Sequence, residues 1–186
     1  MYTPAFEGAV DAICDQFTSE IYVKKGDYVK ELAVPNNDFF FLSKGYLKEM
    51  YKNLYTGEDE LFNFTPPSSV FVNEDTLYFN KRPTHFYLAY TDITFLRLSY
   101  GKYVELLKEF PEIHILYISG TADIQKNRRN RLAMLRMNST IEKIKWVKEV
   151  RPDIYFEMDR TTLAQFIGVS RASLYRAFDK LDMNFY

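Results

Sequence analysis

The sequence predicts an α+β protein in which a β-barrel or jelly roll is followed by a long helix and a small helical domain. Three observations support this prediction. Short β-branched and aromatic runs fill residues 21–98, helical periodicity fills residues 112–135, and two short helices joined by a tight turn occupy residues 160–178. A chain of 186 residues is long enough for two small domains.

The first half of the chain starts as a helix and continues as strands. Apolar residues at helical spacing predict an amphipathic helix over residues 5–17. Turn-forming segments then separate the strand-like runs at residues 25–27, 35–38, 44–45, 56–59 and 65–69. Short strands at this spacing are typical of a barrel or jelly roll, and Thr56-Gly57-Glu58 predicts a hairpin turn.

Helices return at Ser99, whose hydroxyl can cap a helix over residues 101–110. Pro111 breaks that helix and can open the next one. The next helix carries a stripe that is apolar at first and polar later, formed by Ile113, Leu116, Tyr117, Gly120, Ile124, Asn127, Arg131, Leu132 and Leu135. Such a stripe needs a partner surface, which is either the barrel of the same chain or a second copy.

A further helix is expected from Asn138-Ser139-Thr140 to Val150, with an apolar face, and Arg151-Pro152-Asp153 ends it. Residues 154–158 have room for one short strand of a wing. Asp159 or Thr161 can cap the helix that follows. We therefore divide the chain into a barrel domain (residues 1–110), a long helix (111–136) and a C-terminal domain (137–186).

The most informative segment begins at Arg160. Apolar residues recur at helical spacing up to Ile167, Gly168 can adopt the positive φ that ends a helix, and Val169 fills the corner. Ser170 is a good N-cap for a second helix. Its outward side chains are Arg171, Ser173, Tyr175 and Arg176, and its inward ones are Leu174, Ala177, Phe178 and Leu181. A basic, hydrogen-bonding helix behind a glycine corner is typical of a helix-turn-helix, which holds its second helix in the DNA major groove.

The run from Leu163 to Arg176 resembles the DNA-binding signature of the Crp/Fnr superfamily of bacterial transcription regulators. Residues 23–28 and 39–48 resemble the entry strands and glycine turns of that family. The resemblance implies a cyclic-nucleotide-binding-like barrel, a dimerisation helix and a winged helix-turn-helix. We therefore expect a homodimer through residues 112–135, because a two-fold protein can place two DNA-reading helices one turn of DNA apart. Only eight residues follow Phe178, so we expect the wing after the second helix to be reduced or missing.

The predicted function is that of a homodimeric, sequence-specific DNA-binding transcription regulator. The side chains expected on bases or phosphates are Arg171, Tyr175 and Arg176, and those expected on the DNA backbone are Arg160, Thr162, Ser170 and Ser173. Ala172 stands where the family pattern has an acidic residue, so the preferred operator is expected to differ. The alternative is a ligand-sensing or protein-interaction module whose C-terminal part no longer reads DNA.

The region that binds cyclic AMP in some members of the family corresponds to residues 69–85. Glu74 is present, but Asn73 replaces the glycine that lets the backbone approach a phosphate, and Arg82 is followed by Pro83. We expect the barrel not to bind cyclic AMP in the usual manner. An unidentified small-molecule effector would have a candidate pocket at Glu74, Lys81, Arg82 and Thr84.

Charge is divided unevenly along the chain. Residues 126–186 hold 13 lysines and arginines against 7 acidic residues, a net +6, whereas residues 1–125 hold 11 against 18, a net −7. A basic C-terminal half suits phosphate attraction at that end only. The expected partners are double-stranded DNA, a second copy of the chain and RNA polymerase.

Other classes of function receive little support. Cys14 is the only cysteine, so we expect neither a disulfide framework nor an iron–sulfur cluster, and it is either a core residue or a redox sensor. His85 and His114 have no metal-ligand spacing, and no phosphate-binding or nucleophile motif indicates an enzyme. No apolar run is long enough to span a membrane, which favours a cytoplasmic protein.

Overall fold

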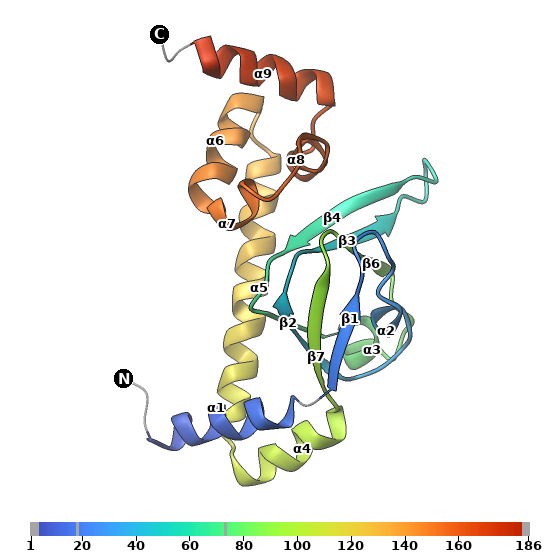
Figure 1. The fold of residues 1–186 in the computed structure, drawn as a ribbon, viewed down its shortest axis with the longest axis vertical. Helices are drawn as coiled ribbons and strands as arrows, with labels where there is room; N and C mark the ends of the chain where they lie inside the picture. Colours follow the sequence, from blue (N-terminus) through green and yellow to red (C-terminus); the bar gives the residue numbers. More distant parts are fainter. Residues whose placement is uncertain (1–3, 18, 73, 184–186) are drawn as a thin grey trace.

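A computed structural model describes residues 4–17, 19–72 and 74–183 (Figure 1). The strands are β1 (Ser19–Val23), β2 (Phe39–Lys44), β3 (Leu47–Lys52), β4 (Asp59–Thr65), β5 (Ser69–Val72), β6 (His85–Ala89) and β7 (Ile93–Leu98). The helices are α1 (Pro4–Gln16), α2 (Lys30–Ala33), α3 (Glu74–Phe79), α4 (Tyr100–Glu109), α5 (Ile113–Leu135), α6 (Thr140–Val150), α7 (Pro152–Tyr155), α8 (Arg160–Ile167) and α9 (Arg171–Met183). The α+β class and the order of barrel, long helix and helical domain are as predicted.

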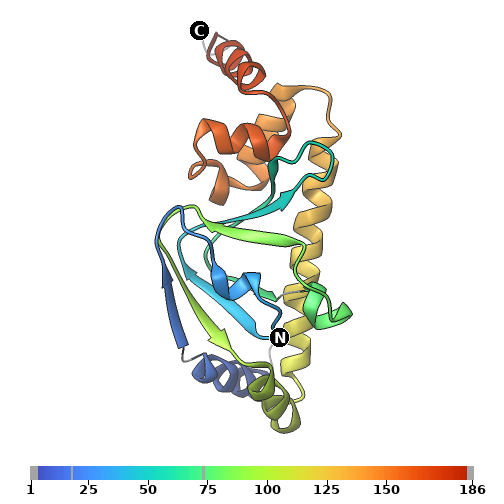
Figure 2. The same ribbon diagram turned by 90° about the vertical axis from the view of Figure 1, so that its right-hand side faces the viewer.

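The strands form two antiparallel sheets that face each other (Figure 2). One sheet has four strands in the order β1-β7-β2-β5, and the other has three in the order β4-β3-β6. The predicted hairpin turn lies between β3 and β4, where Gly57 has a φ of 73°. Buried side chains from both sheets and from α2 fill the space between them, including Phe40, Leu42, Leu47 and Phe95.

Strand β2 shows how the sequence divides its side chains between two faces. Successive residues of a strand point to opposite sides, so the run Phe39-Phe40-Phe41 cannot serve one core. Phe40 is 1% exposed and lies between the two sheets, where its ring stacks on Phe71 at 5.8 Å. Phe39 points the other way and packs on Tyr103 of α4 and Tyr117 of α5. The outer face of the four-stranded sheet is therefore apolar and is covered by α1, α4 and the first part of α5.

The long helix α5 runs from the barrel domain to the C-terminal domain and packs on its own chain with the predicted apolar stripe (Figure 1). Ile113 is fully buried, and Leu116, Tyr117 and Ile124 face the barrel domain. Most residues of the stripe therefore pack on the barrel of their own chain, which is one of the two partner surfaces that the sequence allowed. The far side of α5 exposes other apolar residues, among them Ile118 at 54% and Leu132 at 61%.

The C-terminal domain consists of helices in its described part, up to residue 183. The short wing strand expected at residues 154–158 is absent there, which corrects the prediction. Pro152 occupies the first turn of α7, a position that proline favours because its ring fixes a helical φ. Ile154 then turns inward and is fully buried, with its amide donating to the carbonyl of Arg151 at 3.2 Å.

The barrel and C-terminal domains share one hydrophobic core. Met50, Leu61 and Phe64 of the three-stranded sheet belong to the same buried cluster as the inward residues of α6, α8 and α9. Arg131 of α5 crosses this junction: its guanidinium lies 4.9 Å from the centre of the Phe166 ring and donates to the carbonyl of Leu61 at 3.3 Å. The C-terminal domain is therefore packed against the barrel and not suspended on a linker.

Candidate nucleic-acid interface

Helices α8 and α9 are joined by a corner built on Gly168. Its φ of 66° and ψ of 48° are left-handed, and its amide and that of Val169 return to carbonyls of α8. Lys143 of α6 is 7% exposed and donates from Nζ to the carbonyl of Ile167 at 3.1 Å. A cation at this point satisfies a terminal carbonyl and complements the negative end of α8. The predicted glycine corner is confirmed, and the supporting lysine is an addition that the sequence did not reveal.

The N-terminus of α8 is fixed to the barrel domain. Asp159 is the N-cap, and its Oδ1 accepts from the amide of Thr162 at 2.6 Å, which confirms one of the two predicted caps. Tyr90, in the loop after β6, accepts at its hydroxyl from the amide of Asp159 at 2.7 Å. Burial would raise the pKa of Asp159, but hydrogen bonds from Thr162 and Tyr90 outweigh it and lower that pKa. The carboxylate therefore remains charged while it caps the helix.

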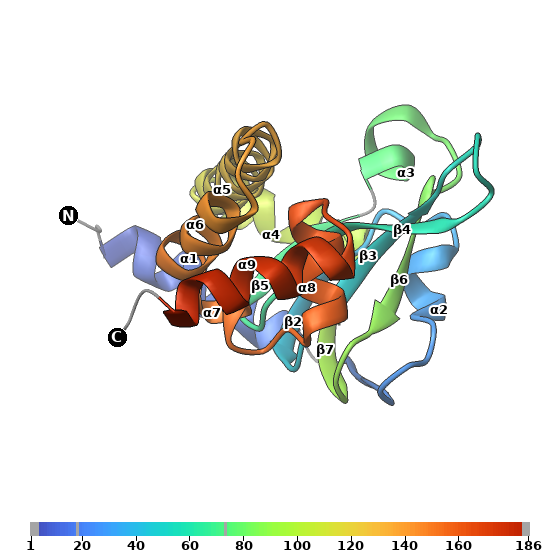
Figure 3. The same ribbon diagram turned by 90° about the horizontal axis from the view of Figure 1, so that it is seen from above.

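Helix α9 lies at the end of the molecule farthest from α1 and α4, with one side open (Figures 1 and 3). Ser170 caps it by accepting from the amide of Ser173 at 3.1 Å. Arg171, Tyr175 and Arg176 are exposed, Tyr175 at 54%. Leu174 and Ala177 point into the shared core. The division into outward polar and inward apolar residues is the one that the sequence predicted.

The two arginines of this face are held differently. Arg171 stands in the first turn of α9 and makes no hydrogen bond or ion pair among the described residues. Arg176 lies back along the helix, with Nε donating to the carbonyl of Ala172 at 3.3 Å and Nη2 to Oγ of Ser173 at 3.4 Å. Arg171 is thus the arginine that is available without breaking an internal contact.

Arg160 and Thr162 of α8 were both predicted to contact DNA, but only Arg160 is exposed. Arg160 is exposed, and its guanidinium stacks 3.6 Å from the centre of the Phe178 ring, so it lies beside α9. Thr162 is 0% exposed. The expectation that Thr162 contacts the DNA backbone is therefore corrected: its side chain faces the core and cannot reach a phosphate in this arrangement.

A shallow cleft of about 310 Å³ beside α9 adds a residue that sequence reasoning missed. It lies between the first turn of α6 and the side of α9, and it contains Ser139, Thr140, Arg176 and Lys180. Lys180 is exposed one turn beyond Arg176, so a basic edge continues along the helix. The four-residue spacing of these two cations was the available signal in the sequence.

The residues expected to form an effector pocket are not gathered around one cavity. Lys81 and Arg82 are exposed, and Thr84 donates from both its amide and its hydroxyl to Asp75 at 2.7 Å. The side chain of Glu74 lies outside the part of the chain that can be described. A small cavity of about 100 Å³ nearby is lined by other residues, among them Glu49, Asp75 and Arg128.

Among the described residues, two kinds of feature are absent. Histidine, cysteine and acidic side chains form no group of three or more that could hold a metal ion. None of the helices combines the length and the apolar character that crossing a bilayer requires.

No family model and no curated protein matches this sequence. Solved structures match it well. A cyclic nucleotide-binding domain containing protein of Listeria monocytogenes has a TM-score of 0.74 at 12% identity, with 95% of this chain and 91% of that chain covered. The c-di-GMP responsive global regulator CLP of Xanthomonas campestris has a TM-score of 0.67 at 13% identity, covering 96% and 92%. FixK2 of Bradyrhizobium japonicum has a TM-score of 0.69 at 12% identity, covering 89% and 85%.

Proposed function

We propose that this chain, which has the fold of the Crp/Fnr-type transcription regulators, is a homodimeric, sequence-specific DNA-binding transcription regulator. That fold is a cyclic-nucleotide-binding-like barrel followed by a helical C-terminal domain. The observation that supports the proposal most is the open face of α9, where Arg171, Tyr175 and Arg176 are exposed behind a capped N-terminus. An arginine in the first turn of such a helix can pair bidentately with guanine or with a phosphate.

Charge supports the same reading. Residues 126–186, which include α9, hold a net charge of +6, against −7 in residues 1–125. Arg160 beside α9 and Lys180 along it extend the basic surface beyond the recognition residues. Such a distribution attracts the DNA backbone to one end of the molecule and keeps the acidic barrel away from it.

The dimer would form through α5, within residues 112–135. The exposed side of this helix carries residues 115, 118, 122, 125, 129 and 132, whose spacing alternates between three and four as in a coiled coil. Ile115, Ile118 and Leu132 on this side are each more than half exposed. Replacing Leu132 by aspartate should give a monomer in analytical ultracentrifugation, whereas Leu54→Asp on the exposed β3–β4 turn should leave the mass unchanged. Equal masses for both variants would exclude this seam.

DNA binding is tested by fluorescence anisotropy on a duplex selected from a random library, with an unrelated duplex for comparison. Arg171→Ala should weaken binding to the selected duplex by about 1–3 kcal/mol and reduce the preference for it. Lys108→Ala, an exposed cation on α4 at the opposite end, should have no effect on either duplex. If Arg171→Ala retained the full preference, the assignment of α9 as the recognition helix would be wrong.

The response to small molecules belongs to the proposal as well. The related structures include one regulator described as responding to c-di-GMP and one protein described by its cyclic nucleotide-binding domain, so the fold alone does not fix an effector. In this chain, hydrogen bonds from Thr84 lower the pKa of Asp75, which keeps a negative charge in the cavity beside α3. Glu49 adds a second carboxylate to that cavity. Arg128 also lines this cavity and pairs with Glu49 at 3.8 Å, so the charges there are partly balanced. The cavity volume of about 100 Å³ is below the roughly 300–1,000 Å³ of typical small-molecule sites, so calorimetry should detect no micromolar binding of cyclic AMP.

A further inference from the structure

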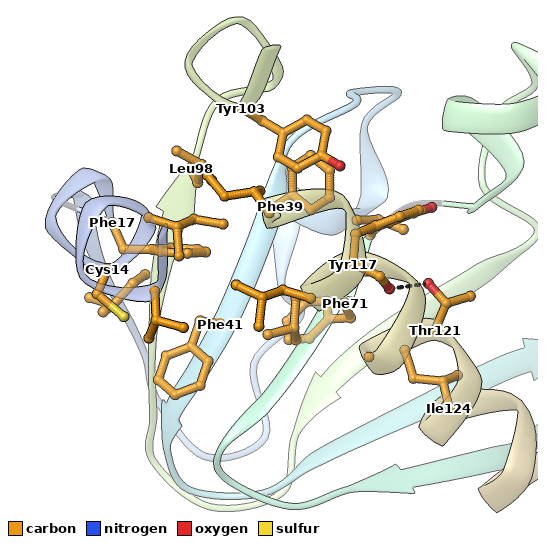
Figure 4. Close-up of a pocket in the computed structure, with 18 residues that line it drawn as sticks. Cys14, Phe17, Phe39, Phe41, Phe71, Leu98, Tyr103, Tyr117, Thr121 and Ile124 are labelled. Carbon is orange, nitrogen blue, oxygen red and sulfur yellow. Dashed lines mark hydrogen bonds between the residues drawn. The ribbon is translucent and has the colours of Figure 1, made fainter. Parts of the chain in front are cut away.

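A further cavity lies on the opposite face of the four-stranded sheet from the barrel interior (Figure 4). Its volume is about 360 Å³. The floor is the outer face of the sheet, with Phe39, Phe41 and Val72, and α1, α4 and α5 form the walls. A cavity of this size and shape is in the range that binds small molecules.

The lining is almost wholly apolar. Aromatic rings come from the sheet, from Phe17 just after α1, and from α4 and α5, and no charged side chain lines the cavity among the residues described. Its polar atoms include the hydroxyl of Thr121, which donates back to the carbonyl of Tyr117 at 2.8 Å, as the dashed line in Figure 4 shows. A buried ionic group would have no counter-charge here, so the lining favours an uncharged ligand.

Helix α5 also defines the length of the cavity and keeps it open. Its residues line the cavity from Ile113 to Ile124, which corresponds to roughly 16 Å at the rise of an α-helix. Gly120 stands in the middle of this stretch, and a Cβ placed on it would meet nothing within 4 Å. A glycine inside a helix costs about 1 kcal/mol relative to alanine. Here it leaves empty space that almost any other residue would fill.

We propose that this cavity is a binding site for an uncharged small molecule with a medium-length hydrocarbon chain. A second copy of the chain is the other conceivable occupant, but the exposed apolar residues Ile118 and Leu132 lie on the side of α5 that faces away from the cavity. One side of α5 therefore closes the cavity and the other is left for a partner helix. The site is separate from the residues that the family resemblance assigns to an effector.

The test uses octanol as the probe and octanoate as its charged counterpart, titrated by calorimetry into the full chain without DNA. Octanol should bind once per chain with a dissociation constant of roughly 100 µM or tighter, and octanoate at least tenfold more weakly. Gly120→Leu should weaken octanol binding at least tenfold because its side chain fills the cavity. Gly120→Ala, which adds one methyl group and favours the helix, should weaken binding less.

Ser119→Leu is the matched control, because Ser119 precedes Gly120 but is exposed outside the cavity. It should change octanol binding by less than twofold. Absence of octanol binding up to its solubility limit, equal binding by Gly120→Leu, or equal binding of octanoate would overturn the proposal. If Gly120→Leu altered the sedimentation mass while octanol failed to bind, the cavity would be a contact between copies. Because no DNA is present, failure here leaves the proposed regulator function untouched.

Discussion

The corner between α8 and α9 allows a stability prediction to be worked out from the structure. Gly168 has a φ of 66°, and a Cβ on it would lie 3.0 Å from Cδ2 of Leu135. A side chain in the left-handed region costs about 1–2 kcal/mol, of which the reduced freedom of the unfolded chain offsets about 0.4–1 kcal/mol. The close contact adds about 1 kcal/mol, at the low end for overpacking because a leucine methyl group can shift. Gly168→Ala should therefore destabilise the protein by roughly 1.5–2 kcal/mol.

Gly57→Ala is the matched control for the contact. Gly57 also has a positive φ, 73°, but a Cβ there would meet nothing within 4 Å. It should cost only the conformational part, roughly 0.5–1 kcal/mol. In thermal unfolding followed by circular dichroism, Gly168→Ala should lower Tm by roughly 3–8 °C and Gly57→Ala by roughly 1–4 °C. When both glycine substitutions are made in a Leu135→Ala background, they should lower Tm by the same amount. Equal losses in the two single variants would refute the argument from the Leu135 contact.

Three further changes test the shared core and its polar supports. Phe64→Ala removes a ring that is 1% exposed and should cost about 3–5 kcal/mol in urea unfolding, whereas Leu54→Ala, 94% exposed, should cost under about 0.5 kcal/mol. Lys143→Met should cost about 1–3 kcal/mol, since the carbonyl of Ile167 loses its buried donor. Hydrogen bonds from Thr84 lower the folded-state pKa of Asp75. The stability that Asp75 contributes is therefore complete above about pH 4, its unfolded value, and is lost as the pH falls from there through the lower folded-state pKa, so Asp75→Asn should flatten the acid side of the stability profile.

Local signals in the sequence were sufficient for most of the fold. Ser99, Asp159 and Gly168 are caps and corners whose chemistry depends on near neighbours, and each has the predicted role. The strand expected after Pro152 is absent because a proline in the first helical turn and a buried Ile154 outweigh a β-favouring composition. Short apolar runs are ambiguous in this way whenever tertiary packing decides.

The candidate site was less accessible to sequence reasoning. Burial of Thr162 and the lysine that supports Ile167 depend on how α6 packs against α8, which no local pattern encodes. The stripe on α5 illustrates the same limit. The spacing of its apolar residues shows that one side of the helix is covered, but it does not show which surface covers that side. In the structure, this side faces the barrel of its own chain. The exposed coiled-coil spacing on the other side becomes visible only when burial is known.

The most direct test of the DNA-binding claim is selection of bound duplexes from a random library, followed by hydroxyl-radical footprinting of the enriched sequence. A dimer that presents two copies of α9 should enrich an inverted repeat and protect two half-sites about one helical turn apart. Protection should fall at both half-sites with Arg171→Ala. An unenriched library, or protection that survives this change in full, would contradict the proposed role of α9.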